Sequence, residues 1–182
     1  MLWQIQTSKH MGLDILAISN LRLITPEVKA ALDRLPEISV GDEPTLTITE
    51  LSKEASHCRC TDMENGDYYR TEDSEEYDFR AGSYSSYGDF RREISETFLN
   101  STPARVWSYP KSYEGHPFYE LVDFSDCEGV LGTEVCAKLH KDFVEGREKF
   151  FEEIESDWSK EKYDSWTKAL AVGKENGVII FC

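Results

Sequence analysis

The feature that most constrains the fold is the stretch from Phe79 to Arg92, in which small residues run directly into a helical pattern. It holds two glycines, three serines, two tyrosines and three arginines within fourteen residues. From Ser86 to about Leu99, apolar residues recur on one face at helical spacing, namely Tyr87, Phe90, Ile94 and Phe98. The stretch therefore predicts a loop that feeds an amphipathic helix. The backbone N–H groups at such a helix start suit an anion.

Other segments of the chain show the patterns of buried strands and of further helices. Leu13–Ser19 is apolar enough for a strand buried on both faces, and Thr45–Leu51 alternates β-branched and apolar residues. Helical spacing follows Thr25-Pro26 and returns after Thr133, which we expect to cap a long helix that Gly146 could interrupt. A further helix is expected around Tyr163, Trp166 and Leu170, and further strands at Phe118–Phe124 and Val178–Phe181.

Length and pattern together predict the domain organisation. A chain of 182 residues with 40% hydrophobic content can bury one sizeable core. Residues 1–10 show no clear period, and Met11-Gly12-Leu13-Asp14 resembles a second start, so we expect residues 1–10 to be a leader or upstream extension. For residues 11–182 we predict a single α+β domain, in which a small mixed or antiparallel sheet packs with three to four helices.

The charge of the chain limits its partners. A formal net charge of −15 repels nucleic acid and anionic membranes, so we expect neither direct nucleic-acid binding nor a membrane location. The same charge favours a basic protein partner, and an anionic ligand would need a local basic site. Homo-oligomer formation stays open.

Five cysteines are an odd number, and neither a secretory signal nor an apolar run of about 20 residues is visible. We therefore predict a reduced, cytoplasmic protein without a structural disulfide. Cys58 and Cys60 are too close for a zinc ribbon, and the sequence predicts no metal site and no cofactor.

The first candidate site lies in the stretch from Phe79 to Arg92. Its candidate ligand-binding residues are Arg80, Ser83, Tyr84, Ser85, Tyr87 and Arg91. The two arginines could clamp a phosphate or carboxylate, the serines could complete the cradle, and a tyrosine could stack on a ring. The alternative is a capped helix start whose arginines pair with the acidic loop at residues 72–76. The lysine and the spacing of a P-loop are missing.

The second candidate site lies where the expected strand Phe118–Phe124 ends. Its candidate residues are Asp123, Ser125, Asp126 and Glu128. Asp126 or Glu128 could accept hydrogen bonds from ribose hydroxyls or a base edge. The alternative is an Asx-type turn completed by Gly129. The ligand spacing of an EF-hand is absent.

Three segments resemble a family of uncharacterised small bacterial and phage proteins. They are Met11–Ile15, Phe79–Ser85 and Leu121–Gly129. The family has an MGLD-type start together with RAGSYSGY-like and DFSDCEG-like segments, and Ser86 here replaces a family-like glycine. The resemblance implies no activity, cofactor or catalytic residue. Its phage members imply, by analogy, a role in conflict between phage and host.

Three functions are compatible with these observations. The favoured one is non-enzymatic binding of a small anionic, nucleotide-like ligand, which in a phage setting would sequester a host defence signal. The alternative is an acidic, DNA-mimic-like inhibitor that binds a basic host protein through the acidic clusters at residues 72–76 and 152–157. The third is a hydrolase in which Cys127 pairs with His140 or His116.

Overall fold

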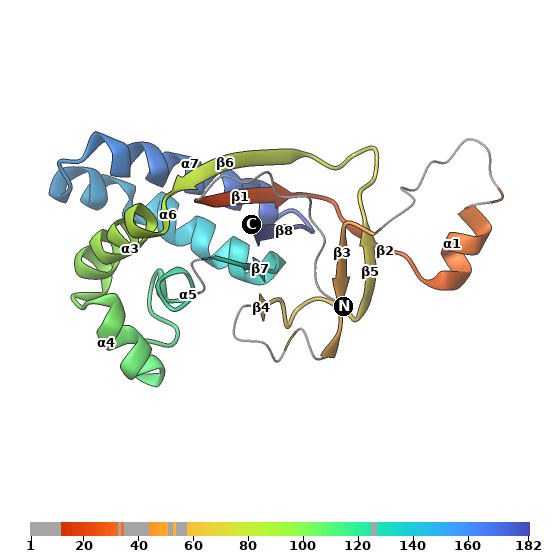
Figure 1. Ribbon diagram of the computed structural model, residues 1–182, viewed down its shortest axis with the longest axis horizontal. Helices are drawn as coiled ribbons and strands as arrows, with labels where there is room; N and C mark the ends of the chain where they lie inside the picture. Colours follow the sequence, from red (N-terminus) through yellow and green to blue (C-terminus); the bar gives the residue numbers. More distant parts are fainter. Residues whose placement is uncertain (1–11, 33, 35–43, 51–52, 54–57, 125–126) are drawn as a thin grey trace.

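The computed structural model describes residues 12–32, 34, 44–50, 53, 58–124 and 127–182 (Figure 1). The prediction of an α+β fold is confirmed, with a five-stranded sheet, a three-stranded sheet and six α-helices in the described residues. The helices are α1 (Pro26–Leu32), α3 (Tyr84–Leu99), α4 (Pro103–Ser108), α5 (Tyr119–Val122), α6 (Thr133–Glu153) and α7 (Asp157–Gly173), with a 3₁₀ turn at Pro110–Ser112.

The larger sheet is mixed. Its strands, in spatial order, are β4 (Cys58–Arg59), β7 (Gly129–Leu131), β8 (Val178–Phe181), β1 (Leu13–Ile18) and β6 (Glu76–Gly82). Neighbours run antiparallel except β4 and β7, which are parallel. The smaller sheet is antiparallel and consists of β2 (Arg22–Leu23), β5 (Gly66–Tyr69) and β3 (Leu46–Ile48).

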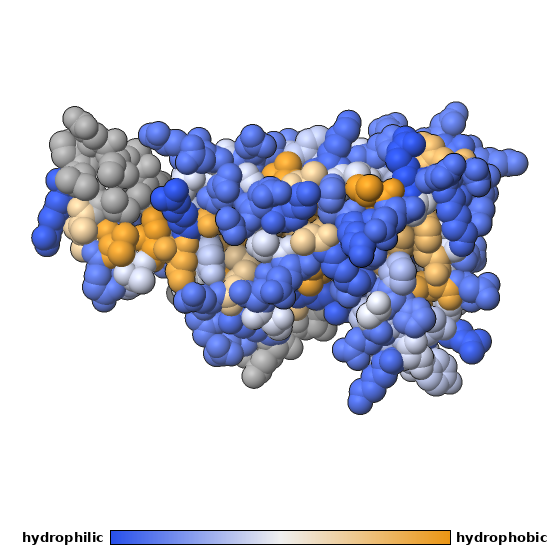
Figure 2. All heavy atoms as spheres, turned by 180° about the vertical axis from the view of Figure 1, so that it is seen from behind, coloured by the Kyte–Doolittle hydropathy of each residue, from blue (hydrophilic) through white to orange (hydrophobic). Residues whose placement is uncertain are grey.

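The central strand β8 is buried on both faces because its residues alternate between two cores, whereas the edge strand β6 is partly exposed. Ile179 and Phe181 of β8 join the core that contains residues of α3, α6 and α7. Val178 and Ile180 of the same strand join the core that contains residues of the smaller sheet. In Figure 1, α3 and α4 lie toward one end of the molecule, and the smaller sheet and α1 lie toward the other. The side seen in Figure 2 is covered mainly by hydrophilic residues, in keeping with the net charge of −15.

One predicted strand is a helix. Phe118–Phe124 contains α5, and Phe118 before it has a φ of 60°. Its first carbonyl groups accept backbone N–H groups within the turn, and its last ones accept side-chain donors: the Trp107 indole N–H donates to the Val122 carbonyl at 2.9 Å. A short apolar run does not distinguish a buried strand from a buried helical turn, because both bury every residue.

The long helix α6 is continuous through Gly146, so the suggested interruption there does not occur. A Cβ atom at Gly146 would lie 2.8 Å from the Phe98 ring, which shows that the glycine permits close packing of α6 against α3. The N-cap of α6 is Gly132, and Thr133 is the first helical residue. The Thr133 hydroxyl donates to the Gly177 carbonyl, 2.9 Å away, which ties the start of α6 to β8.

The prediction that the chain lacks a disulfide is wrong, because Cys58 and Cys60 are bonded. The physical reason is local: Cys58 lies in β4 and Cys60 directly follows this strand, and their Cα atoms are 5.7 Å apart, a separation that a disulfide can span. An odd number of cysteines and an expected cytoplasmic location do not exclude a bridge between two cysteines so close in the sequence. Cys127, Cys136 and Cys182 lie outside the bridge as thiols. None of the helices in the described ranges is both long and apolar enough to cross a membrane.

Candidate functional site

The start of α3 gathers three serine hydroxyls. Ser83 is the N-cap, and its Oγ accepts a hydrogen bond from the Ser86 N–H at 3.1 Å. The same Oγ lies 2.9 Å from the Ser85 hydroxyl and 2.8 Å from the Ser86 hydroxyl. The capped helix start considered as a structural alternative is therefore present. It also places these hydroxyls at the positive end of a helix of 16 residues.

Arg80 and two aromatic rings lie close to this helix start. The Arg80 Nη1 is 3.5 Å from Asp14 Oδ1, and both side chains are about half exposed. The Tyr84 side chain is 48% exposed. A Cβ atom at Gly82 would lie 3.0 Å from Trp158 of α7, so the Trp158 ring borders the turn between β6 and α3. Sequence reasoning missed Trp158, because the pattern of α7 alone does not show which segment it packs against.

Tyr87 and Arg91 face inward and lie away from this exposed cluster. Tyr87 is fully buried, and its ring stacks on Trp166 at 6.0 Å between centroids. Arg91 is 3% exposed and donates from Nη1 to the Phe124 carbonyl at 2.7 Å. Its guanidinium lies 4.8 Å from the centroid of the Tyr87 ring. Arg91 thus joins α3 to the segment of the second candidate site and does not form a surface clamp with Arg80 in this structure.

Asp123 of the second candidate site is held by protein partners. Its Oδ2 accepts hydrogen bonds from Arg59 Nη2 at 2.7 Å and from the Tyr119 hydroxyl at 2.9 Å. Arg59 also donates to the Asp123 carbonyl at 2.8 Å. Burial raises the pKa of Tyr119, and the bond to the Asp123 carboxylate raises it further. Glu128 is exposed, whereas Ser125 and Asp126 lie outside the described residues.

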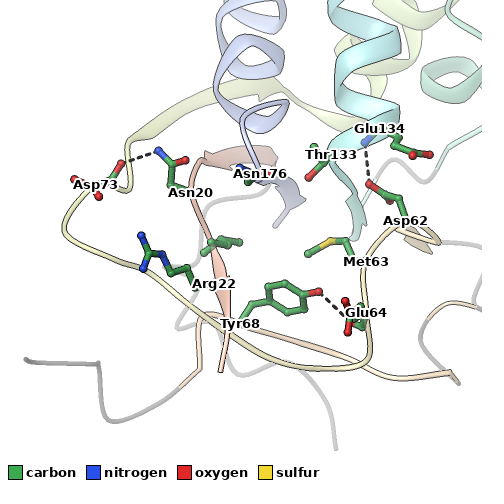
Figure 3. A pocket seen from close by; sticks show the side chains of 11 residues that line it. Asn20, Arg22, Asp62, Met63, Glu64, Tyr68, Asp73, Thr133, Glu134 and Asn176 are labelled. Atoms are coloured by element: carbon green, nitrogen blue, oxygen red, sulfur yellow. Dashed lines mark hydrogen bonds between the residues drawn. The ribbon is translucent and has the colours of Figure 1, made fainter. Parts of the chain in front are cut away.

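A pocket of about 620 Å³ opens on a different part of the molecule, between the smaller sheet and the start of α6 (Figure 3). Its lining residues are Asn20, Leu21, Arg22, Asp62, Met63, Glu64, Tyr68, Asp73, Thr133, Glu134 and Asn176. Four of these side chains are carboxylates and one is an arginine. No sequence pattern indicates this pocket, because its residues come from distant segments.

The carboxylates are unevenly distributed in the pocket. Asp62, Glu64 and Glu134 lie on one side, and Asp73 lies on the other, toward Arg22 (Figure 3). Asp62 Oδ2 accepts a hydrogen bond from the Glu134 N–H at 2.9 Å, so it also holds the start of α6. Negative charge is therefore concentrated on the α6 side of the pocket.

Tyr68 forms part of the pocket wall, and its hydroxyl donates to the Glu64 carbonyl at 3.2 Å. Burial raises the pKa of Tyr68, and the nearby Glu64 and Asp62 carboxylates raise it further, although the bond to the carbonyl lowers it. On the opposite wall, the Asn20 amide donates to the Asp73 carbonyl at 2.9 Å. Both walls are thus fixed by hydrogen bonds that leave the Glu64 and Asp73 side chains facing solvent.

The residues of the hydrolase hypothesis lie as follows. Cys127 is exposed in the segment before β7. His140 lies on α6, where burial lowers its pKa and nearby Lys174 lowers it further, while Glu175 raises it. The ring of His116 packs edge-on against Tyr113, 6.2 Å away. In the part of the chain described, no group of three or more His, Cys, Asp and Glu residues is arranged to hold a metal ion.

Comparison with protein-family models, with curated protein sequences and with solved structures gives no match. The resemblance to the bacterial and phage family therefore stays a prediction from the three segments quoted above.

Proposed function

We propose that the protein binds a basic protein partner and that a lysine or arginine side chain of this partner enters the acidic pocket. The observation that carries the proposal is the pocket itself, of about 620 Å³ with four carboxylates and one arginine in its lining. This is the second of the functions considered from the sequence. The net charge of −15 attracts a basic partner, whereas it would repel an anionic ligand.

The distribution of charge suggests how the basic side chain would lie. The positive charge of Arg22 offsets the negative charge of Asp73 on one wall of the pocket. An ammonium or guanidinium group would therefore be attracted to the opposite wall, which carries Asp62, Glu64 and Glu134. The Tyr68 ring would contact the aliphatic part of the same side chain. Exposed acidic residues elsewhere would act over a longer range and raise the association rate more than the affinity.

Glu64→Gln tests the pocket with little disturbance of the fold. Only the backbone carbonyl of Glu64 accepts the Tyr68 bond, so that bond survives the substitution. Glu148→Gln is the matched control, because it removes the same charge from an exposed residue of α6 outside the pocket lining and outside both acidic clusters. Asp62 is unsuitable for this purpose because it holds the start of α6.

The probe is an arginine-rich peptide, with affinity measured by calorimetric titration. We expect Glu64→Gln to weaken binding by about two- to fivefold, the usual range for one exposed ion pair, and Glu148→Gln to weaken it less. Binding should also weaken between about 50 mM and 500 mM salt. Equal losses in the two variants would show diffuse attraction to the surface and would remove the pocket from the proposal.

A second candidate function is binding of a small anionic, nucleotide-like ligand at the start of α3. It is favoured by the exposed Ser83, Tyr84 and Ser85 side chains at this helix start. Arg80 lies in the preceding strand β6, and the Trp158 ring borders Gly82. A ligand held there could be a host signalling nucleotide, as the resemblance to phage proteins suggests.

Arg80→Lys separates this candidate from the first. Lysine keeps the charge but lacks the planar fork, so affinity for a nucleotide hit from a thermal-shift screen should fall about tenfold to a hundredfold. Arg92→Lys, at an exposed position of α3, is the control. If nucleotides do not raise the melting temperature of the wild-type protein, this candidate fails while the proposal on the acidic pocket is unaffected.

A further inference from the structure

The Cys58–Cys60 bridge closes a loop between residues only two positions apart. A disulfide stabilises a fold chiefly by restricting the unfolded chain, and this effect grows with the length of the closed loop. A bridge with so short a loop restricts the unfolded chain very little. Its main consequence is therefore chemical, since it places two sulfur atoms that can exchange electrons at a defined position in the fold.

The backbone around the two cysteines is held by contacts that do not involve sulfur. β4 pairs with β7, and the Gly132 N–H donates to the Arg59 carbonyl at 2.7 Å. The Arg59 side chain is bonded to Asp123, and Asp62 holds the Glu134 N–H. None of these contacts uses a cysteine sulfur, so reduction of the bridge does not by itself break them. The two thiols would then stay close together and be able to re-form the bond.

The two sulfur atoms differ in access to solvent. Cys60 is completely buried in the core shared with the smaller sheet, whereas Cys58 is partly exposed on the edge strand β4. An external thiol can therefore approach Cys58 and not Cys60. Thiol–disulfide exchange needs such a difference in access. The external thiol attacks the accessible sulfur, and the buried sulfur is released and can later re-form the bridge.

We propose that Cys58 and Cys60 form a redox-active pair that undergoes thiol–disulfide exchange with thiols of the glutathione class or with protein dithiols. The external thiolate attacks Cys58 Sγ, a mixed disulfide forms there, and Cys60 leaves as a thiolate and takes a proton. A second external thiolate attacks the outer sulfur of the mixed disulfide. The products are the Cys58 thiol, which takes the second proton, and an external disulfide that has lost two electrons to the pair.

The three other thiols do not share this environment. Cys136 is fully buried, and burial strongly raises the pKa of its thiol. Burial also raises the pKa of the Cys182 thiol, with a further contribution from Asp14. Cys127 is exposed and can react with the reagents of the test, so it is replaced by serine in every protein compared.

The first measurement uses the folded full chain carrying Cys127→Ser. It is equilibrated in mixtures of reduced and oxidised glutathione, alkylated, and analysed by mass spectrometry of the peptide that contains both cysteines. We expect this peptide to change from bridged to doubly alkylated as the ratio changes, with little change in melting temperature. Reduction that occurs only after denaturant has unfolded the chain would overturn the proposal.

The second measurement identifies the attacked sulfur. In Cys60→Ser, Cys58 has no resolving partner and should accumulate as a mixed disulfide with glutathione. In Cys58→Ser, the buried Cys60 should react at least about tenfold more slowly, since reactivity follows access of the thiolate. Equal rates, or a faster reaction at Cys60, would contradict the assigned roles of the two cysteines.

Discussion

Arg91 is a charged residue that the fold keeps almost fully buried, at 3% exposure. It donates to the Phe124 carbonyl while its guanidinium lies near the rings of Tyr87 and Trp107, at 4.8 and 5.5 Å from their centroids. Only a planar group can donate along its edge and contact aromatic rings with its faces. Arg91 therefore fixes α3 to the segment that follows α5.

Arg91→Lys should accordingly destabilise the protein. The ammonium group cannot reproduce the edge bond and the ring contacts together, and we expect a loss of about 1.5–3 kcal/mol, typical of a hydrogen bond to a charged group. Chemical denaturation followed by circular dichroism measures this loss. Arg92→Lys is the control, because Arg92 is exposed and pairs with Asp89, so its replacement should change stability by less than about 0.5 kcal/mol. Similar losses in both variants would contradict the role given to Arg91.

Residue roles at the candidate sites were only partly accessible from the sequence. The serine-rich helix start could be predicted, because Gly82 and Ser83 directly precede an amphipathic pattern and helix capping is a local interaction. The inward direction of the Arg91 side chain could not be predicted, since it depends on the Phe124 carbonyl, 33 positions away in the chain. The partner of Asp123 is likewise Arg59 on β4, which no local pattern connects to α5.

Among the helices, two glycines serve different purposes. A Cβ atom at Gly88 of α3 would meet nothing within 4 Å. A Cβ atom at Gly146 of α6 would lie 2.8 Å from the Phe98 ring and 3.1 Å from the Tyr163 hydroxyl. Phe98 cannot move away freely, because it stacks on Phe118 at 4.2 Å between centroids. The first glycine only weakens its helix, and the second allows three helices to approach one another.

Gly88→Ala and Gly146→Ala should therefore change stability in opposite directions. Alanine at 88 should stabilise by up to about 1 kcal/mol through helix propensity. Alanine at 146 gains the same propensity but overpacks a tight contact, which usually costs about 1–3 kcal/mol, so a net loss is expected. Urea denaturation of the two variants measures both effects. Stabilisation by alanine at 146 would show that α3 and α6 can separate without cost.

Helices and central strands were the elements that the sequence predicted best. β1, β8, α3, α6 and α7 have long or strongly apolar patterns, so local and tertiary preferences agree. α5 was missed because its apolar run fits a strand equally well, and tertiary donors such as Trp107 decide in favour of a helical turn. The smaller sheet was recognised only in β3, because β2 and β5 are short and take their pairing from each other.

For the molecule as a whole, the net charge of −15 should oppose the compact state. Ion pairs such as those of Arg80 with Asp14 and of Arg147 with Asp164 are about half exposed and contribute little in water. Self-repulsion of the excess carboxylates should therefore exceed the attraction within these pairs. The two cores, in contrast, do not depend on ionic strength.

Raising sodium chloride from about 20 mM to 200 mM, which shortens the screening length, should thus raise the melting temperature at neutral pH. Differential scanning calorimetry over a salt series measures the effect. The melting temperature of a variant in which several exposed glutamates are replaced by glutamine should rise less with salt, because its self-repulsion is already reduced. A melting temperature that falls with salt would mean that the exposed pairs stabilise the fold more than the excess charge destabilises it.

The position of β1 determines how quickly this fold can assemble. β1 lies between β6 and β8, so Ile15 is opposite both Phe79 and Phe181. Joining β1 to β8 closes nearly the whole described chain into one loop, and the entropy of that closure is lost before the contacts compensate for it. α6 and α7 are neighbours in sequence and can pack much earlier. The refolding rate should therefore be set by the encounter of two distant strands, and it should be slow for a protein with so many helices.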